Sequence, residues 1–260
     1  GEKMPARAAD PLAFLPAAPE GALHVPRLAQ LGATIAALEK TRLATLAAAA
    51  LGAKDTEQLA APGVRQLGFD PRRPDGFAAA GIDGARGLAV GVDEAGAQIL
   101  VLPVADEGAF GAYVASLAGR LGAPTRGAAT WQAPAEGDAP PAKPVEVTTF
   151  AAADGAVRVA WGARDGWAVV AADADAVAAV GRALSRPWER SLANDPVWRR
   201  MAGKLGERDL TVWMAKGLAQ DGRRGRRFDE GLALGISASG KGLNLRALVP
   251  RGPLELAMLA

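Results

Sequence analysis

Hydrophobic and polar residues follow the same order in two separate places along the chain. Residues Gly87–Gly96 read GLAVGVDEAG and residues Gly231–Gly240 read GLALGISASG, so the apolar and glycine positions match. An apolar run, a short polar turn that ends in Gly and a second apolar run are typical of a β-hairpin. The recurrence of this pattern predicts a chain built from repeated units of strands and helices.

The first clear unit predicts strands at Leu88–Val92 and Ile99–Val104, followed by a helix that Asp106 is suited to cap. The second unit predicts strands near residues 145–150, 157–161 and 167–171. An Ala-rich helix follows at residues 175–184, and a third hairpin spans residues 231–249. The chain therefore repeats a strand–strand–helix order about three times.

Apolar patterns outside these units predict further strands and helices. A strand is expected at Ala22–Val25, and apolar residues at helical spacing predict a helix from Leu28 towards Leu51. The sequence Asn194-Asp195-Pro196 predicts the start of another helix, because it offers a capping side chain and a proline at the first helical position. A further strand is expected at Leu210–Met214.

These elements predict an α+β fold of repeated strand–strand–helix units, which form antiparallel sheets with helices packed on one face. Prolines and glycines concentrate in residues 122–144, which predicts a linker or long loop. It would join two similar halves, 22–121 and 145–260, after an extended lead-in at residues 1–21. The third unit ends just as its helix begins, so we expect the natural protein to extend further.

Composition narrows the classes of function. A net charge of +2 provides no basic stripe of the kind that nucleic-acid-binding proteins carry, so no nucleic-acid partner is expected. The lack of Cys excludes thiolate nucleophiles and Cys-type metal sites, and it favours a bacterial envelope protein. No run of apolar residues is long enough for a transmembrane helix. No phosphate-binding loop or dinucleotide fingerprint is present, so no cofactor or metal is expected.

Catalytic candidates are few. His24 is the only histidine, so a Ser–His–acid triad would require it, but its place in a strand pattern favours a structural role. Asp70, Asp75 and Asp83 lie close together in the sequence and could form an acid–base pair or hold a cation. Asp70 and Asp83 stand beside Pro and Gly, as residues that initiate turns do. No catalytic residue is therefore predicted.

Candidates for binding a partner are clearer. A dense run of arginines could hold a phosphate, a lipid head group or an acidic partner. Tryptophans at 161, 198 and 213 are expected in the core, whereas two others stand among Pro and polar residues, where exposure is as well supported as burial. The predicted partner-binding residues are Arg223, Arg224, Arg226, Arg227, Trp131 and Trp188.

Three phrases together resemble a loosely defined group of uncharacterised bacterial exported proteins and lipoproteins. They are Asp10–Pro16 (DPLAFLP), Leu67–Pro71 (LGFDP) with Gly81–Asp83 (GID), and Ser191–Pro196 (SLANDP). The resemblance implies an envelope location and a repeated α+β fold, and it carries no catalytic residues. This chain has no lipidated Cys, and its Leu-Pro-Ala-Ala opening departs from the usual form of the group.

We therefore expect a non-enzymatic protein of the periplasm or cell surface of a high-GC bacterium, which binds a partner protein or macromolecule as a scaffold. One alternative is a carrier of a lipid or apolar small molecule in a groove between the two halves. A second alternative is a hydrolase that uses carboxylates. A cytoplasmic location remains the alternative to the envelope.

Overall fold

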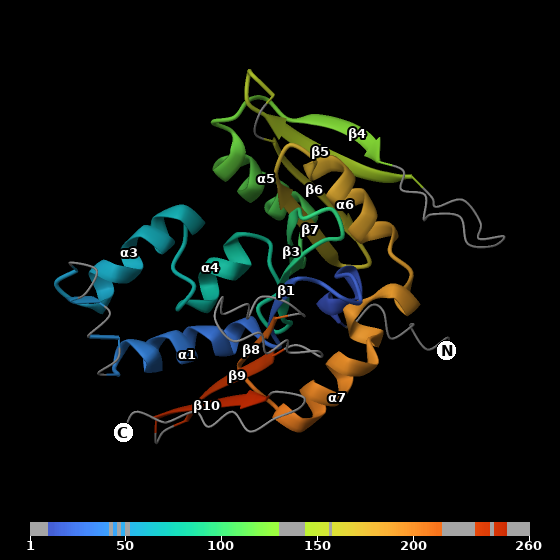
Figure 1. The fold of residues 1–260 in the computed structure, drawn as a ribbon. Coiled ribbons are helices and arrows are strands. Elements are labelled where there is room, and N and C mark those ends of the chain that lie inside the picture. The colour runs from blue at the N-terminus through green and yellow to red at the C-terminus, as the bar shows by residue number, and fades with distance from the viewer. Residues whose placement is uncertain are drawn as a thin grey trace, which may run out of the picture.

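The computed structural model describes residues 10–41, 44–45, 48–49, 53–129, 144–155, 158–214, 232–239 and 242–248. Figure 1 shows the helices and strands, with 3-10 helices written η. Their bounds in chain order are η2 (Pro11–Phe14), β1 (Gly21–Val25), α1 (Leu28–Glu39), α3 (Thr56–Leu67), α4 (Pro74–Ala79), β2 (Leu88–Val92), β3 (Gln98–Pro103), α5 (Glu107–Ala118), β4 (Thr125–Ala129), β5 (Val145–Ala151), β6 (Arg158–Arg164), β7 (Trp167–Ala172), α6 (Ala176–Ser185), η3 (Trp188–Arg190), η4 (Leu192–Asn194), α7 (Pro196–Leu205), β8 (Leu210–Met214), β9 (Leu232–Ser239) and β10 (Gly242–Leu248).

The strands form one ten-stranded antiparallel sheet in the order β10-β9-β8-β1-β2-β3-β7-β6-β5-β4. The predicted hairpins are present as β2–β3, β6–β7 and β9–β10. Helix α5 follows the first hairpin and α6 follows the second, so the α+β class and the repeated strand–strand–helix order are confirmed.

The two matching stretches occupy equivalent places, because each contributes the first strand of a hairpin. Gly91 of β2 and Gly235 of β9 are the shared inner glycines. A Cβ added at Gly91 would lie 2.9 Å from the side chain of Leu15, and one added at Gly235 would lie 2.7 Å from that of Arg208. A long side chain crosses the strand at both places, and glycine leaves the room for it.

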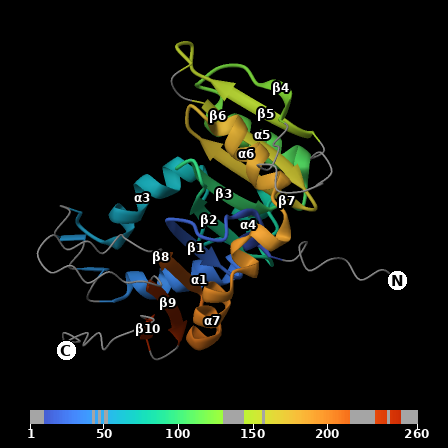
Figure 2. The same cartoon turned by 45° about the vertical axis from the view of Figure 1, so that its right-hand side comes forward.

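Helices lie on both faces of the sheet, which differs from the single covered face that we expected. Along β3, Ile99 and Val101 belong to one core cluster and Leu102 to another, because successive side chains point to opposite faces. Helices α6 and α7 contribute to the first cluster, and α1, α4 and α5 contribute to the second. Figures 1 and 2 show α5 and α6 on opposite sides of the strands. Strands that are apolar on both faces need cover on both.

The sheet does not divide where the two halves were expected to meet. Strand β1, near the N-terminus, pairs with β2 on one side and with β8 on the other. Strand β3 pairs in turn with β7. Part of the expected linker, residues 125–129, forms the edge strand β4, while residues 130–143 and 249–260 lie outside the described part. Strands from both halves of the sequence thus alternate in a single sheet.

Helix starts follow the predicted capping chemistry. The Asp106 carboxylate accepts a hydrogen bond of 3.0 Å from the Ala109 amide at the start of α5. Asp195 accepts one of 2.7 Å from the Trp198 amide at the start of α7, directly before a proline at the first helical position. None of the helices in the described residues is long and apolar enough to cross a membrane.

Candidate functional site

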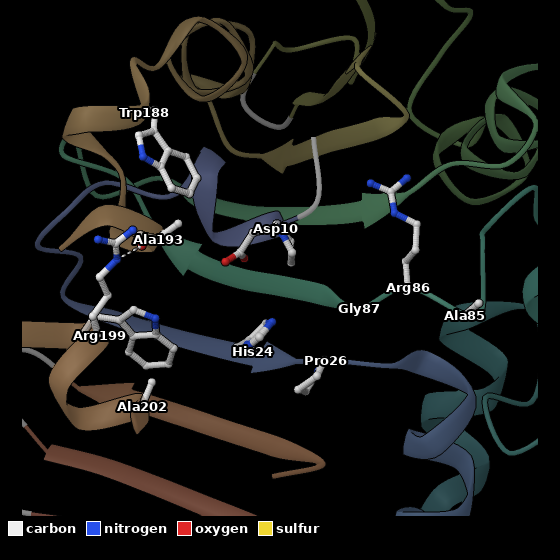
Figure 3. A pocket seen from close by; sticks show the side chains of 12 residues that line it. Asp10, His24, Pro26, Ala85, Arg86, Gly87, Trp188, Ala193, Arg199 and Ala202 are labelled. Atoms are coloured by element: carbon white, nitrogen blue, oxygen red, sulfur yellow. Dashed lines mark hydrogen bonds between the residues drawn. The ribbon is translucent and has the colours of Figure 1, made fainter. Parts of the chain in front are cut away.

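A cavity of about 760 Å³ lies against β1, and we call it the β1 cavity (Figure 3). Its walls come from four separate stretches of sequence. Asp10 and Pro11 stand at the start of η2, and His24 and Pro26 lie on and after β1. Residues 85–87 precede β2, and residues 188–202 run from η3 into α7. The cavity therefore exists only when the N-terminal stretch and residues 188–202 come together.

Backbone hydrogen bonds hold the N-terminal wall against the C-terminal wall. The Leu192 amide donates to the Leu15 carbonyl at 3.0 Å, and the Ala17 amide donates to the Arg190 carbonyl at 3.0 Å. The Asp10 carboxylate accepts the Leu12 amide at 2.9 Å, which begins η2 and fixes where this carboxylate stands. The opening of the cavity is thus framed by ordered backbone on both sides.

His24 lies at the centre of the β1 cavity. It stands opposite Ala89 of β2 and Thr211 of β8, on the face of the sheet that α7 covers. Its ring meets Trp198 edge to face, with the centroids 6.4 Å apart and an interplanar angle of 77°. Trp198 in turn packs edge to face on Trp213, at 6.0 Å and 83°. Aromatic packing therefore holds the imidazole in place.

The imidazole of His24 is half-buried and has no hydrogen-bond partner among the described residues. Burial lowers the pKa of His24 from its ordinary value, and the negative charge of Asp10 opposes part of that effect. Burial therefore favours the neutral ring, in which one ring nitrogen can accept a hydrogen bond.

Two arginines line the cavity and differ in how they are held. The Arg86 guanidinium lies 3.9 Å over the Trp167 ring and donates to the Gly166 carbonyl at 3.0 Å. Burial lowers the pKa of Arg86, and the charge of Asp83 opposes that effect. Arg199 is exposed at the opening, where its Nε donates to the Ala193 carbonyl at 3.0 Å. One arginine is therefore part of the packing, and the other is exposed and is held through its Nε.

The residues that the sequence singled out lie in three kinds of place: the β1 cavity, the core, and the part of the chain outside the described residues. Trp188 lines the β1 cavity, and His24 lies in a strand but also lines the cavity. Trp198 and Trp213 are buried, as predicted, and Trp161 packs against the core cluster of α5. The remaining predicted binding residues lie outside the described residues: Trp131, Arg223, Arg224, Arg226 and Arg227.

The three candidate acids do not line the cavity, and two of them, Asp70 and Asp83, lie in turns. Both oxygens of Asp70 accept hydrogen bonds of 2.8 Å from the Arg72 guanidinium, and this pairing lowers the pKa of Asp70. Asp83 accepts the Ala85 amide at 3.0 Å, as a turn residue does. Asp75 lies in the first turn of α4. Within the part of the chain that the structure describes, no group of three His, Cys, Asp or Glu side chains could hold a metal ion.

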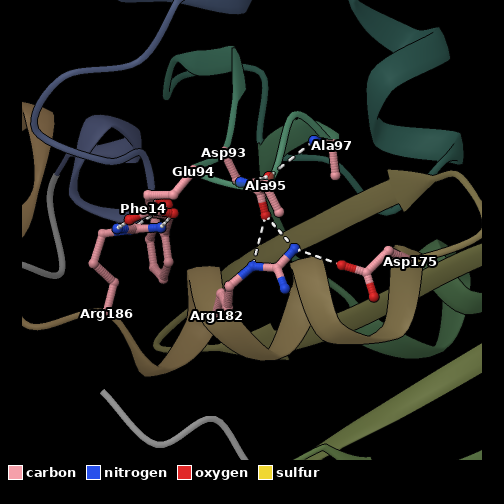
Figure 4. Close-up of polar contacts among 8 residues, drawn as sticks. All are labelled: Phe14, Asp93, Glu94, Ala95, Ala97, Asp175, Arg182 and Arg186. Atoms are coloured by element: carbon pink, nitrogen blue, oxygen red, sulfur yellow. Dashed lines mark hydrogen bonds and ion pairs between the residues drawn. The ribbon is translucent and has the colours of Figure 1, made fainter. Parts of the chain in front are cut away.

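A second set of charges, which we call the turn cluster, consists of Asp93, Glu94, Arg182 and Arg186 (Figure 4). The Asp93 carboxylate is fully buried and accepts bonds of 2.9 Å from the amides of Ala95 and Ala97. It also accepts the Arg182 Nε at 2.8 Å, and Arg186 donates to both oxygens of Glu94. These contacts fasten the β2–β3 turn to α6.

Sequence reasoning did not identify Asp10, Arg86, Trp198 or Arg199 as residues that line the β1 cavity. The sequence analysis named Asp10 only as part of the Asp10–Pro16 motif. It placed Trp198 in the core and did not name Arg199. No local pattern joins residue 10 to residue 199. The one available signal was Asp10 before Pro11, which indicates a helix cap and therefore an ordered carboxylate.

Comparison with known proteins adds little. The chain matches no family model, and no curated protein is similar to it. Two solved structures are distantly similar, both of them crystal forms of TP0453. Form IV has a TM-score of 0.42 and 9% sequence identity, over 92% of this chain and 79% of that one. Form III has a TM-score of 0.42 and 12% identity, over 95% of this chain and 83% of that one.

Proposed function

We propose that this chain is a non-enzymatic binding protein, which holds a small amphipathic molecule in the β1 cavity. The observation that carries the proposal is the cavity itself, where two tryptophans, a neutral histidine and an outward-facing arginine converge. It corresponds to the carrier that we listed as an alternative to a scaffold, with a more polar lining than a purely apolar groove.

Size and lining support this proposal. Small-molecule sites commonly have volumes of about 300–1,000 Å³, with mostly apolar walls and a few placed polar groups. The β1 cavity has a volume of about 760 Å³ and indole, proline and alanine walls. Its polar groups are few, and each has a defined position. Asp10 is fixed by its η2 cap and His24 by β1. Arg86 is fixed by its bond to Gly166 and Arg199 by its bond to Ala193.

A catalytic role is not part of the proposal, because His24 lacks a suitable partner for nucleophilic chemistry. Among the described residues that line the cavity there is no Ser, Thr, Cys or Lys side chain that His24 could activate. An envelope location is proposed from the sequence resemblance and the lack of Cys. A scaffold role would depend on the arginine run of residues 223–227, which lies outside the described residues.

The test is binding of the fluorescent amphipath 8-anilinonaphthalene-1-sulfonate, followed by its emission and by quenching of tryptophan emission. Ala202→Trp should fill the cavity and weaken binding at least tenfold, because Ala202 of α7 lines it. Gly203→Trp adds the same ring to the same helix at an exposed position with open space around it, and should bind like the wild type.

Trp188→Ala gives a second variant in case Ala202→Trp does not fold, because Trp188 is half-buried and lines the same cavity. Equal affinity of all these variants for the probe would refute the β1 cavity as the site. An enzymatic activity of the wild type that is lost in His24→Gln would refute the non-enzymatic part of the proposal.

A further inference from the structure

We propose that the ligand of the β1 cavity is a zwitterion with an apolar body: a carboxylate or phosphate at Arg199, an ammonium group at Asp10 and His24, and the body against the two tryptophans. An amino acid or short peptide with large apolar side chains is the simplest member of this class. The inference rests on the proposed function and specifies its ligand.

The anion-binding end is Arg199. Its Nε is tied to the Ala193 carbonyl at 3.0 Å, so the guanidinium plane is held in one orientation. Within the described residues, its two outer nitrogens have no protein partner. A guanidinium fork matches the two oxygens of a carboxylate or phosphate, and a fork that is already oriented loses less entropy on binding. Figure 3 shows this side chain beside Ala193, on the opposite side of the view from Arg86.

The cation-binding end is Asp10 with His24. One Asp10 oxygen caps η2 by accepting the Leu12 amide, which holds the carboxylate in place and leaves its other oxygen without a partner among the described residues. In Figure 3 the Asp10 carboxylate stands above the His24 ring. Because burial lowers the pKa of His24, the neutral ring can accept a hydrogen bond from an ammonium group instead of repelling it.

The combination of charges selects a zwitterion over a simple ion. An anion would meet Arg199 favourably but would also face the Asp10 carboxylate. A cation would meet Asp10 favourably but would face Arg199. Arg86 also keeps its positive charge, but its guanidinium is held against Trp167 and the Gly166 carbonyl, so Arg199 is the arginine placed to bind an anion. A molecule with both charges places each one beside its opposite, which is how charged sites achieve specificity.

The experiment uses the dipeptide Phe-Phe in four forms: free, N-acetylated, C-amidated and blocked at both ends. The apolar body is the same in each, so calorimetry isolates the terminal charges. We expect the free form to bind tightest, with a loss of about tenfold for each blocked terminus, as charge-assisted hydrogen bonds commonly provide.

Two variants assign each terminus to its residue. Arg199→Gln should bind the free and amidated forms equally, and Lys204→Gln, which removes an exposed charge from the same helix, should discriminate as the wild type does. Asp10→Asn, which can still cap η2, should no longer distinguish the free from the acetylated form. Asp106→Asn is its control, because Asp106 caps α5 away from the cavity.

Equal affinity of the wild type for all four forms would overturn the zwitterion assignment. So would binding no stronger in the wild type than in Ala202→Trp. Either result leaves the proposed function to its own test with the fluorescent amphipath, so the two failures are distinguishable.

Discussion

The turn cluster and the β1 cavity both contain arginines and acids on the same face of the sheet, but only in the turn cluster are they paired with each other. In the turn cluster, Asp93 is fully buried and meets Arg182 and two backbone amides. In the β1 cavity, the described residues leave Asp10 with an unused oxygen and Arg199 with unused nitrogens. Similar residue types thus stabilise the fold in the turn cluster, whereas in the β1 cavity they can still bind a ligand.

Burial explains the difference. A buried charge without a partner strongly destabilises the folded state, so the turn cluster has to be internally paired. Burial alone would raise the pKa of Glu94, but the hydrogen bond to Arg186, a backbone hydrogen bond and the charges of Arg186 and Arg182 together lower the pKa below its ordinary value. The groups of the β1 cavity are half-buried or exposed, and water can satisfy them until a ligand binds.

The largest expected effect on the free energy of unfolding comes from removing an acid of the turn cluster. Asp93→Ala leaves the Ala95 and Ala97 amides and the Arg182 guanidinium without their buried acceptor, which should lower the free energy of unfolding by about 3 kcal/mol. Urea denaturation measures it. Asp93→Asn keeps an acceptor for the amides and should lose less, and the exposed Glu20→Ala is the control. A midpoint for Asp93→Ala equal to that of Glu20→Ala would show that the turn cluster is not structural.

A smaller effect is expected at the half-exposed edge of the turn cluster. Glu94→Ala removes the acid that faces the buried Arg186, whose Nε still donates to the Phe14 carbonyl at 3.2 Å. We expect a loss of about 1–2 kcal/mol, less than for a fully buried pair. A double-mutant cycle with Arg186→Met in urea denaturation isolates the pairwise part. Strict additivity would mean that the two side chains do not stabilise each other.

In the β1 cavity, the burial of His24 predicts that the stability of the folded protein depends on pH. The pKa of His24 in the folded protein lies below its unfolded value, so the unfolded chain binds a proton that the folded chain excludes. The stabilising contribution is therefore present above the unfolded pKa, about 6.5, and is lost as the pH falls towards the folded pKa. Thermal unfolding between pH 8 and 5 should show a steeper loss in the wild type than in His24→Gln. An equal loss of thermal stability with falling pH in the wild type and in His24→Gln would contradict this prediction.

The smallest effect on stability is expected where the charges are unpaired. Asp10→Asn and Arg199→Gln should change the free energy of unfolding by less than about 0.5 kcal/mol, because both side chains remain accessible to water. The same variants should change ligand preference, as described above. A loss of 2 kcal/mol or more in urea denaturation would place these residues with the turn cluster, as structural groups.

Much of the fold could be predicted because its signals are local. The alternation at Leu88–Val92, the caps at Asp106 and Asp195 and the proline after Asp195 each depend on residues within a few positions of one another. The covered second face could not be predicted in this way. A strand such as β3, which is apolar on both faces, indicates burial but does not say which helix provides the cover.

The chain's own sequence determined most of the elements, the repeated strand–strand–helix order and the α+β class, since periodicity and capping are properties of neighbouring residues. It did not indicate the edge strand β4 or the helix α3. Tertiary structure alone decided that β1 joins strands from both halves of the chain, and that Asp10, His24 and Arg199 share one cavity. These residues are brought together by pairing between distant strands and by the backbone bonds of Leu15 to Leu192 and of Ala17 to Arg190. Such contacts depend on the whole sheet, and no spacing along the sequence encodes them.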